Sequence, residues 1–281
     1  MENWRFIDTG INNGFLNMAI DEAILDTHIG RKCPPTLRVY RWSSPTLSLG
    51  YFQSMEREID EKRCSELGID IVRRQTGGRA VLHHNELTYS IVASEVYGFP
   101  KSIMESYRLL SEGLITAYQI LGLEVCLEDH TREPSSAACF TGAGLADLAF
   151  HGRKLCGSAQ FRRGDALLQH GSLPIELDAN LLFSLLRYPS TAVRDKAQAD
   201  FSHKAAGISE FFGNNIGWQQ LKEALLKGFQ ISLGIEFYDD NLTAEEIVLS
   251  RRLTGEKYRS MNWNYHGKYE TSLVDQTTAI R

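Results

Sequence analysis

The side chains best suited to chemistry gather in one short stretch, IVRRQTGGRAVLHH, at positions 71–84. Its adjacent glycines, Gly77 and Gly78, stand between arginines and a pair of histidines. Adjacent glycines adopt backbone conformations that other residues avoid, and they let a ligand approach the backbone closely. Neighbouring arginines favour an anionic ligand. The spacing matches neither a P-loop nor a dinucleotide-binding GxGxxG motif, so a plain turn and an anion site both remain open.

The charged side chains of this stretch also have structural interpretations. Arg73 and Arg74 end a predicted strand, where one guanidinium can be solvated and the other paired. His83 and His84 are neighbours on a predicted strand, so their side chains point to opposite faces and do not readily share a metal ion. His170, in the segment QHGS, has the same structural alternative. The pattern predicts no metal site.

The cysteines suggest a reducing setting and one possible nucleophile. They are odd in number and lack CxxC spacing, which favours free thiols in a cytoplasm over disulfides or a zinc site. We expect Cys126 and Cys156, inside apolar strand patterns, to be buried. Cys139 differs, because it lies in a loop of small residues, SSAACFTGAG, where its thiol would be accessible. A nucleophilic cysteine also needs a group that stabilises its thiolate, and Lys154 and Arg153 are candidate cationic neighbours.

Composition excludes several classes of protein. The chain has 281 residues, 43% of them hydrophobic and 23% charged, which is typical of a globular protein with a sizeable core. A formal charge of −5 gives no general reason to bind nucleic acid. The N-terminus does not read as a signal peptide, and no long apolar run predicts a membrane span. We expect one domain over residues 1–270 and a loose tail at 271–281, where periodicity is absent.

Isolated helices alternate irregularly with runs of strands, which indicates an α+β (mixed α/β) fold. Residues 86–94 alternate in polarity and predict a half-buried strand. Thr243 and Glu246 have the spacing of a capping box at the start of a helix. The predicted helices cover residues 13–28, 55–68, 105–122, 180–186, 218–229 and 243–261. The predicted strands flank a turn at 43–45, lie at 69–74, 86–94 and 123–128, form a hairpin around 150–154, and continue through 164–177.

Four segments together resemble the superfamily of lipoate–protein ligases and lipoyl (octanoyl) transferases. They are NMAIDEAIL, LRVYRWSSPTLSLGYFQ, RRQTGGRAVLHHNELTYS and GRKLCGSAQFRRGDALLQHGSL, and they cover roughly residues 15–175 in the order typical of the superfamily. The resemblance implies a fold similar to the catalytic domain of biotin protein ligases, with mixed β-sheets flanked by helices.

Two details resemble the octanoyltransferase branch that works without a cofactor. Arg79 stands where ATP-dependent ligases typically carry a third glycine. Cys139 is followed by Phe140 in the loop ahead of the GRK hairpin, as in the cofactor-independent branch found in Gram-positive-type bacteria. The resemblance therefore implies that neither ATP nor a metal is needed.

The implied reaction is a two-step acyl transfer through a thioester. Cys139 would take the octanoyl group from octanoyl–acyl carrier protein, and a lysine of a lipoyl-accepting protein would then displace it. The acceptor would be the glycine cleavage H protein or the lipoyl domain of a 2-oxoacid dehydrogenase E2. Lys154 would lower the pKa of the thiol and hold the acyl carbonyl. The protein would be a cytoplasmic monomer, and the sequence names no base for the acceptor lysine.

The resemblance also implies an acyl slot built from three segments. A flat, narrow slot needs backbone rather than bulky side chains at its walls, which gives the glycines a physical role. The implied substrate-binding residues are Arg73, Gly77, Gly78, Arg79, Ala80 and His83 from the first segment, Gly157, Ser158 and Ala159 from the second, and His170 and Gly171 from the third.

Three other functions stay open. An ATP-dependent lipoate–protein ligase would not need Cys139. An amidotransferase would use similar cysteine chemistry to move octanoate from one lipoyl domain to another. A non-catalytic module that only binds acyl carrier or lipoyl domains would be unaffected by Cys139→Ala.

Overall fold

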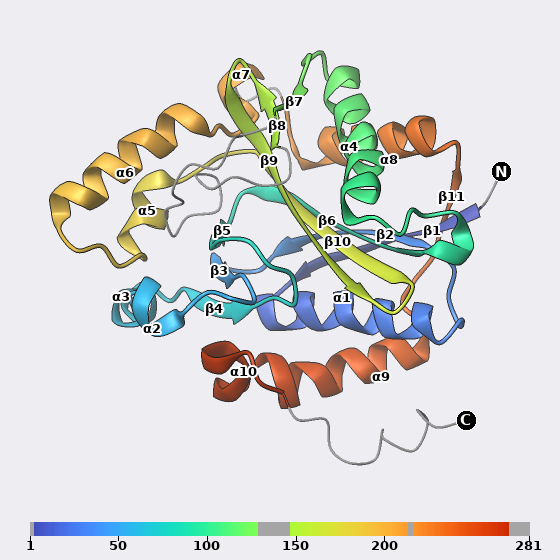
Figure 1. Ribbon diagram of the computed structural model, residues 1–281, viewed down its shortest axis with the longest axis horizontal. Coiled ribbons are helices and arrows are strands. Elements are labelled where there is room, and N and C mark those ends of the chain that lie inside the picture. The colour runs from blue at the N-terminus through green and yellow to red at the C-terminus, as the bar shows by residue number, and fades with distance from the viewer. Residues whose placement is uncertain (1–2, 129–146, 213–215, 270–281) are drawn as a thin grey trace.

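The computed structural model describes residues 3–128, 147–212 and 216–269, which form two β-sheets with helices around them (Figure 1). The larger sheet has eight strands in the order β11-β1-β2-β6-β10-β9-β8-β7. Within it, β1 runs parallel to β2 and to β11, and the other neighbours are antiparallel. The strands are β1 (Asn3–Asn12), β2 (Thr36–Trp42), β6 (Glu86–Ser94), β7 (Cys126–Glu128), β8 (Asp147–Phe150), β9 (Arg153–Arg163), β10 (Ala166–Pro174) and β11 (Glu236–Asp239).

The smaller sheet has three strands in the order β4-β3-β5. They are β3 (Thr46–Leu49), β4 (Asp70–Arg73) and β5 (Val81–His83), with β3 parallel to β4 and antiparallel to β5. The predicted strands around the turn at 43–45 are therefore confirmed, but they belong to different sheets. The chain leaves the larger sheet at Trp42 and enters the smaller one at Thr46.

Helices cover both faces of the larger sheet (Figure 1). On one face α4 packs against α8, and on the other α1 lies against the strands with α9 packed on its far side. The predicted mixed sheets flanked by helices are thus confirmed. The helices are α1 (Gly14–Ile29), α2 (Met55–Glu58), α3 (Glu61–Glu66), η1 (Glu95–Tyr97), α4 (Ile103–Ile120), α5 (Ala179–Ser184), α6 (Thr191–Lys204), α7 (Ser209–Phe212), α8 (Trp218–Leu233), α9 (Ala244–Leu253), the π-helical turn η4 (Thr254–Tyr258) and α10 (Met261–His266).

Side-chain caps explain where two helices begin. The Asn13 side chain accepts a hydrogen bond from the Leu16 amide at the start of α1. The capping box of α9 forms as predicted, with reciprocal bonds between Thr243 and Glu246. The helix predicted to run on to residue 261 instead changes to a π-helical turn at Thr254 and then to α10.

Three predictions about local structure are wrong. Residues 55–68 form two short helices, because Ile59 is extended and the Asp60 side chain caps a new helix at the Arg63 amide. All nine residues of β6 are buried, because the strand lies between β2 and β10 with helices over both faces. Cys126 is exposed, because β7 is the edge strand of its sheet, whereas Cys156 is buried as expected.

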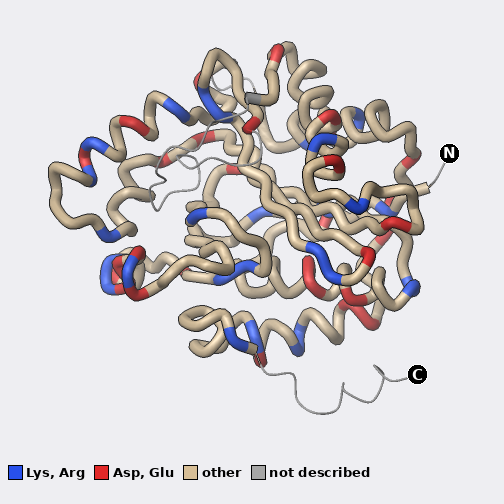
Figure 2. The backbone as a smooth tube through the Cα atoms, viewed as in Figure 1, with Lys and Arg blue, Asp and Glu red and all other residues tan. Residues whose placement is uncertain are grey.

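Charge is spread over the outer helices in both signs. Figure 2 shows Lys and Arg interspersed with Asp and Glu along α2, α3 and α6, while the central strands carry few charges. In the ranges that the structure describes, no helix is both long enough and apolar enough to cross a membrane.

Candidate functional site

A cavity lies where the two sheets meet. Its lining comes from α1, β2, β6, β9 and β10 on one side and from β3, β5 and the Gly77–Gly78 turn on the other. The cavity has a volume of about 50 Å³, which is more than one water molecule needs. The lining residues are Met18, Tyr40, Ser48, Arg74, Gly78, Val81, His83, Thr88, Gly157, Ser158, Ala159, His170, Gly171 and Ser172.

Seven of the residues expected at the acyl slot line this cavity, and they come from all three predicted segments. Gly78 adopts a left-handed conformation, with φ of 94°, at the turn between β4 and β5. Gly171 is packed so closely that an added Cβ would lie 2.5 Å from the Tyr89 ring. The seven are Gly78, His83, Gly157, Ser158, Ala159, His170 and Gly171.

The other four expected slot residues, Arg73, Gly77, Arg79 and Ala80, are not among those that line the cavity. Arg73 is buried, and its guanidinium donates to backbone carbonyls of the β3–α2 loop and of α10. Arg79 forms an ion pair with Glu58 at 3.3 Å, and Ala80 lies in the core of the smaller sheet.

Of the two residues expected to carry the reaction, the structure describes Lys154 only. Cys139 lies outside the described residues. Lys154, on β9, is buried with its Nζ 2.6 Å from Oδ1 of Asp147, a residue that sequence reasoning missed. Burial raises the pKa of the nearby Cys156 thiol to about 12, which makes it a poor nucleophile.

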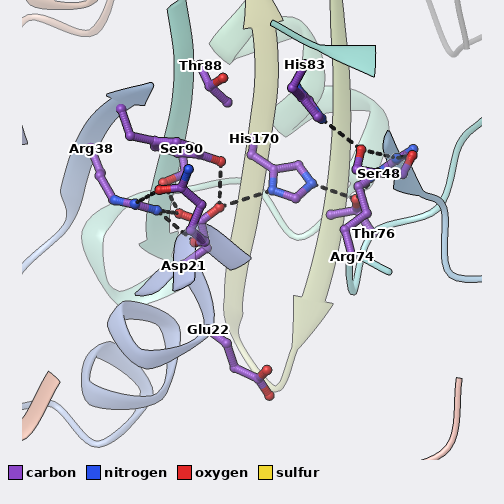
Figure 3. Close-up of polar contacts among 12 residues, drawn as sticks. Asp21, Glu22, Arg38, Ser48, Arg74, Thr76, His83, Thr88, Ser90 and His170 are labelled. Atoms are coloured by element: carbon purple, nitrogen blue, oxygen red, sulfur yellow. Dashed lines mark hydrogen bonds and ion pairs between the residues drawn. The ribbon is translucent and has the colours of Figure 1, made fainter. Parts of the chain in front are cut away.

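Asp21 and His170 form the first of two carboxylate–histidine pairs at the cavity (Figure 3). His170 Nδ1 lies 3.2 Å from the Asp21 carboxylate, and its Nε2 lies 2.7 Å from the Thr76 hydroxyl. Burial lowers the pKa of His170. Burial also opposes ionisation of Asp21, but the Arg38 guanidinium at 2.6 Å and the hydrogen bond from His170 outweigh it, so the pKa of Asp21 lies below its usual value. The pair therefore holds an ionised carboxylate beside a neutral imidazole.

His83 and Glu86 form the second pair. His83 Nδ1 lies 2.8 Å from Oε1 of Glu86, and its Nε2 lies 2.8 Å from the Ser48 hydroxyl. The ring stacks on Trp42 with centroids 3.9 Å apart. Burial opposes ionisation of Glu86, but His83 and the hydroxyls of Thr88 and Ser172 outweigh it and lower its pKa. Each histidine thus has its orientation fixed by a buried carboxylate.

Sequence reasoning missed the partners of both histidines. One signal was present: Asp21 and Glu22 sit inside an apolar helical segment, and α1 buries both of them. A carboxylate on a buried face needs a partner, so Asp21 marks a polar network. Within the described ranges, no three His, Cys, Asp or Glu side chains gather in a way that could hold a metal ion.

Comparisons with known proteins agree with this architecture. The family model for the lipoyl protein ligase A/B catalytic domain matches residues 13–230. The chain is 44% identical to Octanoyltransferase LipM of Geobacillus kaustophilus, over 94% of this chain and 98% of the relative. It is 39% identical to Octanoyltransferase LipM of Bacillus subtilis, with the same coverage of each chain.

Solved structures show the same fold. A bi-partite lipoate protein ligase from Thermoplasma acidophilum superposes with a TM-score of 0.80 at 27% identity, covering 98% of this chain and all of that one. Lipoate-protein ligase A bound with ATP gives a TM-score of 0.77 at 27% identity, covering 94% of this chain and 99% of that one. With a family match over most of its length and relatives that align almost end to end, the chain belongs to the lipoyl protein ligase A/B catalytic-domain family.

Proposed function

We propose that this protein is an octanoyltransferase of lipoate biosynthesis, which moves an octanoyl group from octanoyl–acyl carrier protein to a lysine of a lipoyl-accepting protein. The observation that carries the proposal is the near end-to-end similarity, at 44% identity, to a relative named as an octanoyltransferase. The solved ligases are less similar, at 27% identity, and support the fold.

The proposed first step uses Cys139, a residue that is predicted to be the nucleophile from the sequence alone. Its thiolate attacks the carbonyl carbon of the octanoyl thioester, a new C–S bond forms, and the C–S bond to the carrier breaks so that the carrier leaves as a thiolate. The acceptor lysine amine then attacks the enzyme thioester, a C–N bond forms, the amine loses a proton, and the Cys139 thiolate is released. The amide product is more stable than the thioester, so the second step runs downhill.

The cavity supplies a place for the acyl chain in this scheme. Gly157, Gly171 and Gly78 expose backbone to the cavity, which leaves a narrow space that suits an unbranched alkyl chain. Lys154 would assist the thiolate and the acyl oxygen, in line with the resemblance. The thioester is already activated, so the proposal includes neither ATP nor a metal.

The partners and setting are part of the same proposal. The acceptor is the glycine cleavage H protein or an E2 lipoyl domain, and the solved archaeal ligase belongs to a lipoylation system with such an E2 lipoyl domain. We propose that the enzyme works as a monomer in the cytoplasm, where the free thiols of Cys33, Cys64, Cys126 and Cys156 stay reduced.

Intact mass spectrometry tests the proposal directly. The pure protein is incubated with octanoyl–acyl carrier protein without ATP, and one octanoyl adduct is expected. The adduct is lost in Cys139→Ala and kept in Cys126→Ala, a matched control because Cys126 is the exposed thiol among the described residues. Addition of a lipoyl-accepting domain then discharges the adduct. Absence of an adduct on the wild-type protein refutes the proposal.

Two further incubations separate the alternatives. Transfer of free lipoate that depends on ATP and survives Cys139→Ala identifies a ligase. Adduct formation from an octanoylated lipoyl domain, but not from the acyl carrier protein, identifies an amidotransferase.

A further inference from the structure

Oxygens of the described residues engage all the donors of the Arg74 guanidinium. An arginine side chain carries five N–H groups, and Arg74 makes at least five hydrogen bonds to these oxygens. Nε donates to the Thr76 hydroxyl at 3.2 Å, and Nη1 donates to both the carbonyl and the hydroxyl of Ser48 at 3.0 and 2.9 Å. Nη2 donates to the carbonyls of Gly77 and Arg79 at 2.9 and 2.7 Å. This arginine therefore holds the glycine turn in place and does not act as an anion site.

Arg74 also determines the direction of the hydrogen bonds around it. It can only donate, so the hydroxyls of Thr76 and Ser48 accept from it and each has its own proton left to give. The Thr76 hydroxyl lies 2.7 Å from Nε2 of His170, and the Ser48 hydroxyl lies 2.8 Å from Nε2 of His83. Nδ1 of each imidazole faces a carboxylate.

One continuous hydrogen-bonded chain results, from Asp21 through Arg74 to Glu86. The guanidinium joins two arms, and each arm consists of a carboxylate, an imidazole and a hydroxyl. The first arm is Asp21, His170 and Thr76, and the second is Glu86, His83 and Ser48. Figure 3 shows the part from Asp21 through His170 and Arg74 to His83. These hydrogen bonds connect α1 and β10, on the side of the larger sheet, with β3 and β5 of the smaller sheet. They therefore link the two sides of the cavity.

The remaining polar side chains of the cavity are paired as well. Ser158 bonds with the Tyr89 hydroxyl at 2.9 Å, and Tyr40 donates to the Asp21 carboxylate at 3.1 Å. Ser172 donates to Glu86 at 2.7 Å, and Thr88 donates to the same carboxylate while it accepts from the Trp42 indole. No side chain of the cavity lining is among the buried, unpartnered polar groups of the described residues.

We infer that Arg74 is a positioning residue that gives the cavity its selectivity for a saturated acyl chain over one that ends in a polar group. A polar end entering the cavity would lose its water and find the polar side chains of the described lining already hydrogen-bonded to other protein groups. An alkyl end loses nothing comparable. The inference rests on the proposed function in one respect, namely that the cavity holds the acyl chain.

The test compares two acyl donors on variants of Arg74. The rate of adduct formation is measured by intact mass with octanoyl– and 8-hydroxyoctanoyl–acyl carrier protein. In Arg74→Lys, at least two of the five acceptors lose their donor, because an ammonium has three N–H groups. We expect the preference for octanoyl over hydroxyoctanoyl to fall about tenfold. An acceptor that has lost its Arg74 donor can bond the terminal hydroxyl of the substrate, and one such hydrogen bond accounts for about that factor.

Matched variants separate this effect from a loss of stability. Arg5→Lys also alters a buried, forked arginine, which pairs with Glu246 away from the cavity, so it lowers stability and leaves the acyl preference unchanged. If Arg74→Lys fails to fold, Thr76→Val takes its place, because it removes the hydroxyl that joins Arg74 Nε to Nε2 of His170, and Thr76→Ser restores the preference.

The outcomes distinguish the two proposals. A wild-type protein without an octanoyl adduct refutes the octanoyltransferase, and the inference is then decided by calorimetric binding of octanoate and 8-hydroxyoctanoate to the same variants. A folded Arg74→Lys or Thr76→Val protein that keeps the wild-type preference overturns the role of Arg74.

Discussion

Replacing Gly50 with alanine tests how tightly the glycine turn is held against the smaller sheet. A Cβ built at Gly50 lies 2.0 Å from the Gly78 carbonyl oxygen and 2.8 Å from its carbonyl carbon. An ordinary contact starts at 3.4 Å, so the carbonyl must shift by the difference between 3.4 and 2.0 Å, or 1.4 Å. Both groups belong to the backbone, and neither can rotate away. We expect the free energy of unfolding to fall by about 1–3 kcal/mol.

The same shift moves a residue of the cavity lining, because Gly78 contributes to it. A displacement of about 1 Å in a positioned group costs on the order of a hundredfold in rate, so octanoyl-adduct formation should slow by about that factor. Urea unfolding followed by circular dichroism gives the stability, and intact mass gives the rate.

Gly255→Ala is the matched control for Gly50→Ala. A Cβ at Gly255 meets no atom within 4 Å, and the residue lies in the π-helical turn. This variant should be as stable as the wild type or more stable by up to about 1 kcal/mol. If Gly50→Ala unfolds at the wild-type urea concentration and keeps the wild-type rate, the close approach of Gly50 and the turn is refuted.

Three further variants address single interactions. Thr243→Ala removes the capping box of α9 and should cost about 1 kcal/mol in urea unfolding, and an unchanged midpoint would contradict the cap. Asp147→Asn replaces the carboxylate 2.6 Å from the buried Lys154 ammonium with a neutral amide and should lower the free energy of unfolding by about 3 kcal/mol, with much of the loss recovered when Lys154→Met is added. Burial holds the pKa of His170 below 6.5, so the unfolded chain takes up its proton at a higher pH than the folded chain, and stability falls as the pH drops below 6.5. His170→Gln should remove that share of the acid sensitivity, up to about 1.4 kcal/mol per pH unit, and an unchanged pH slope in urea unfolding would argue against a neutral His170.

Local signals predicted the elements whose cause is local. The capping box at Thr243 and the hairpin around Gly152 are set by residues a few positions apart, and both formed as expected. The prediction that β6 is half-buried was wrong, because helices distant in sequence cover the second face of the strand. Helix α6 was not predicted, since Phe201 is the buried residue on it and no apolar stripe marks the helix.

The site could be predicted only in part, for a similar reason. Its glycines and histidines stand out as residue types, and seven of the expected residues do meet at one cavity. Arg73 and Arg74 are adjacent and have the same side chain. Arg73 nevertheless donates to a carbonyl of α10, whereas Arg74 donates to the two hydroxyls that contact the histidines. Their partners lie on separate elements, so only the tertiary arrangement distinguishes them.

The fully paired cavity lining has a consequence for inhibitor chemistry. A compound that brings an amide or a hydroxyl into this space meets lining side chains that are already hydrogen-bonded to other protein groups, so added polar groups contribute little affinity. Affinity has to come from the shape of an alkyl or thioether chain and from a reactive group aimed at the proposed nucleophile, Cys139. Medicinal chemistry on this scaffold should therefore start from acylating lipid mimics rather than from hydrogen-bonding fragments.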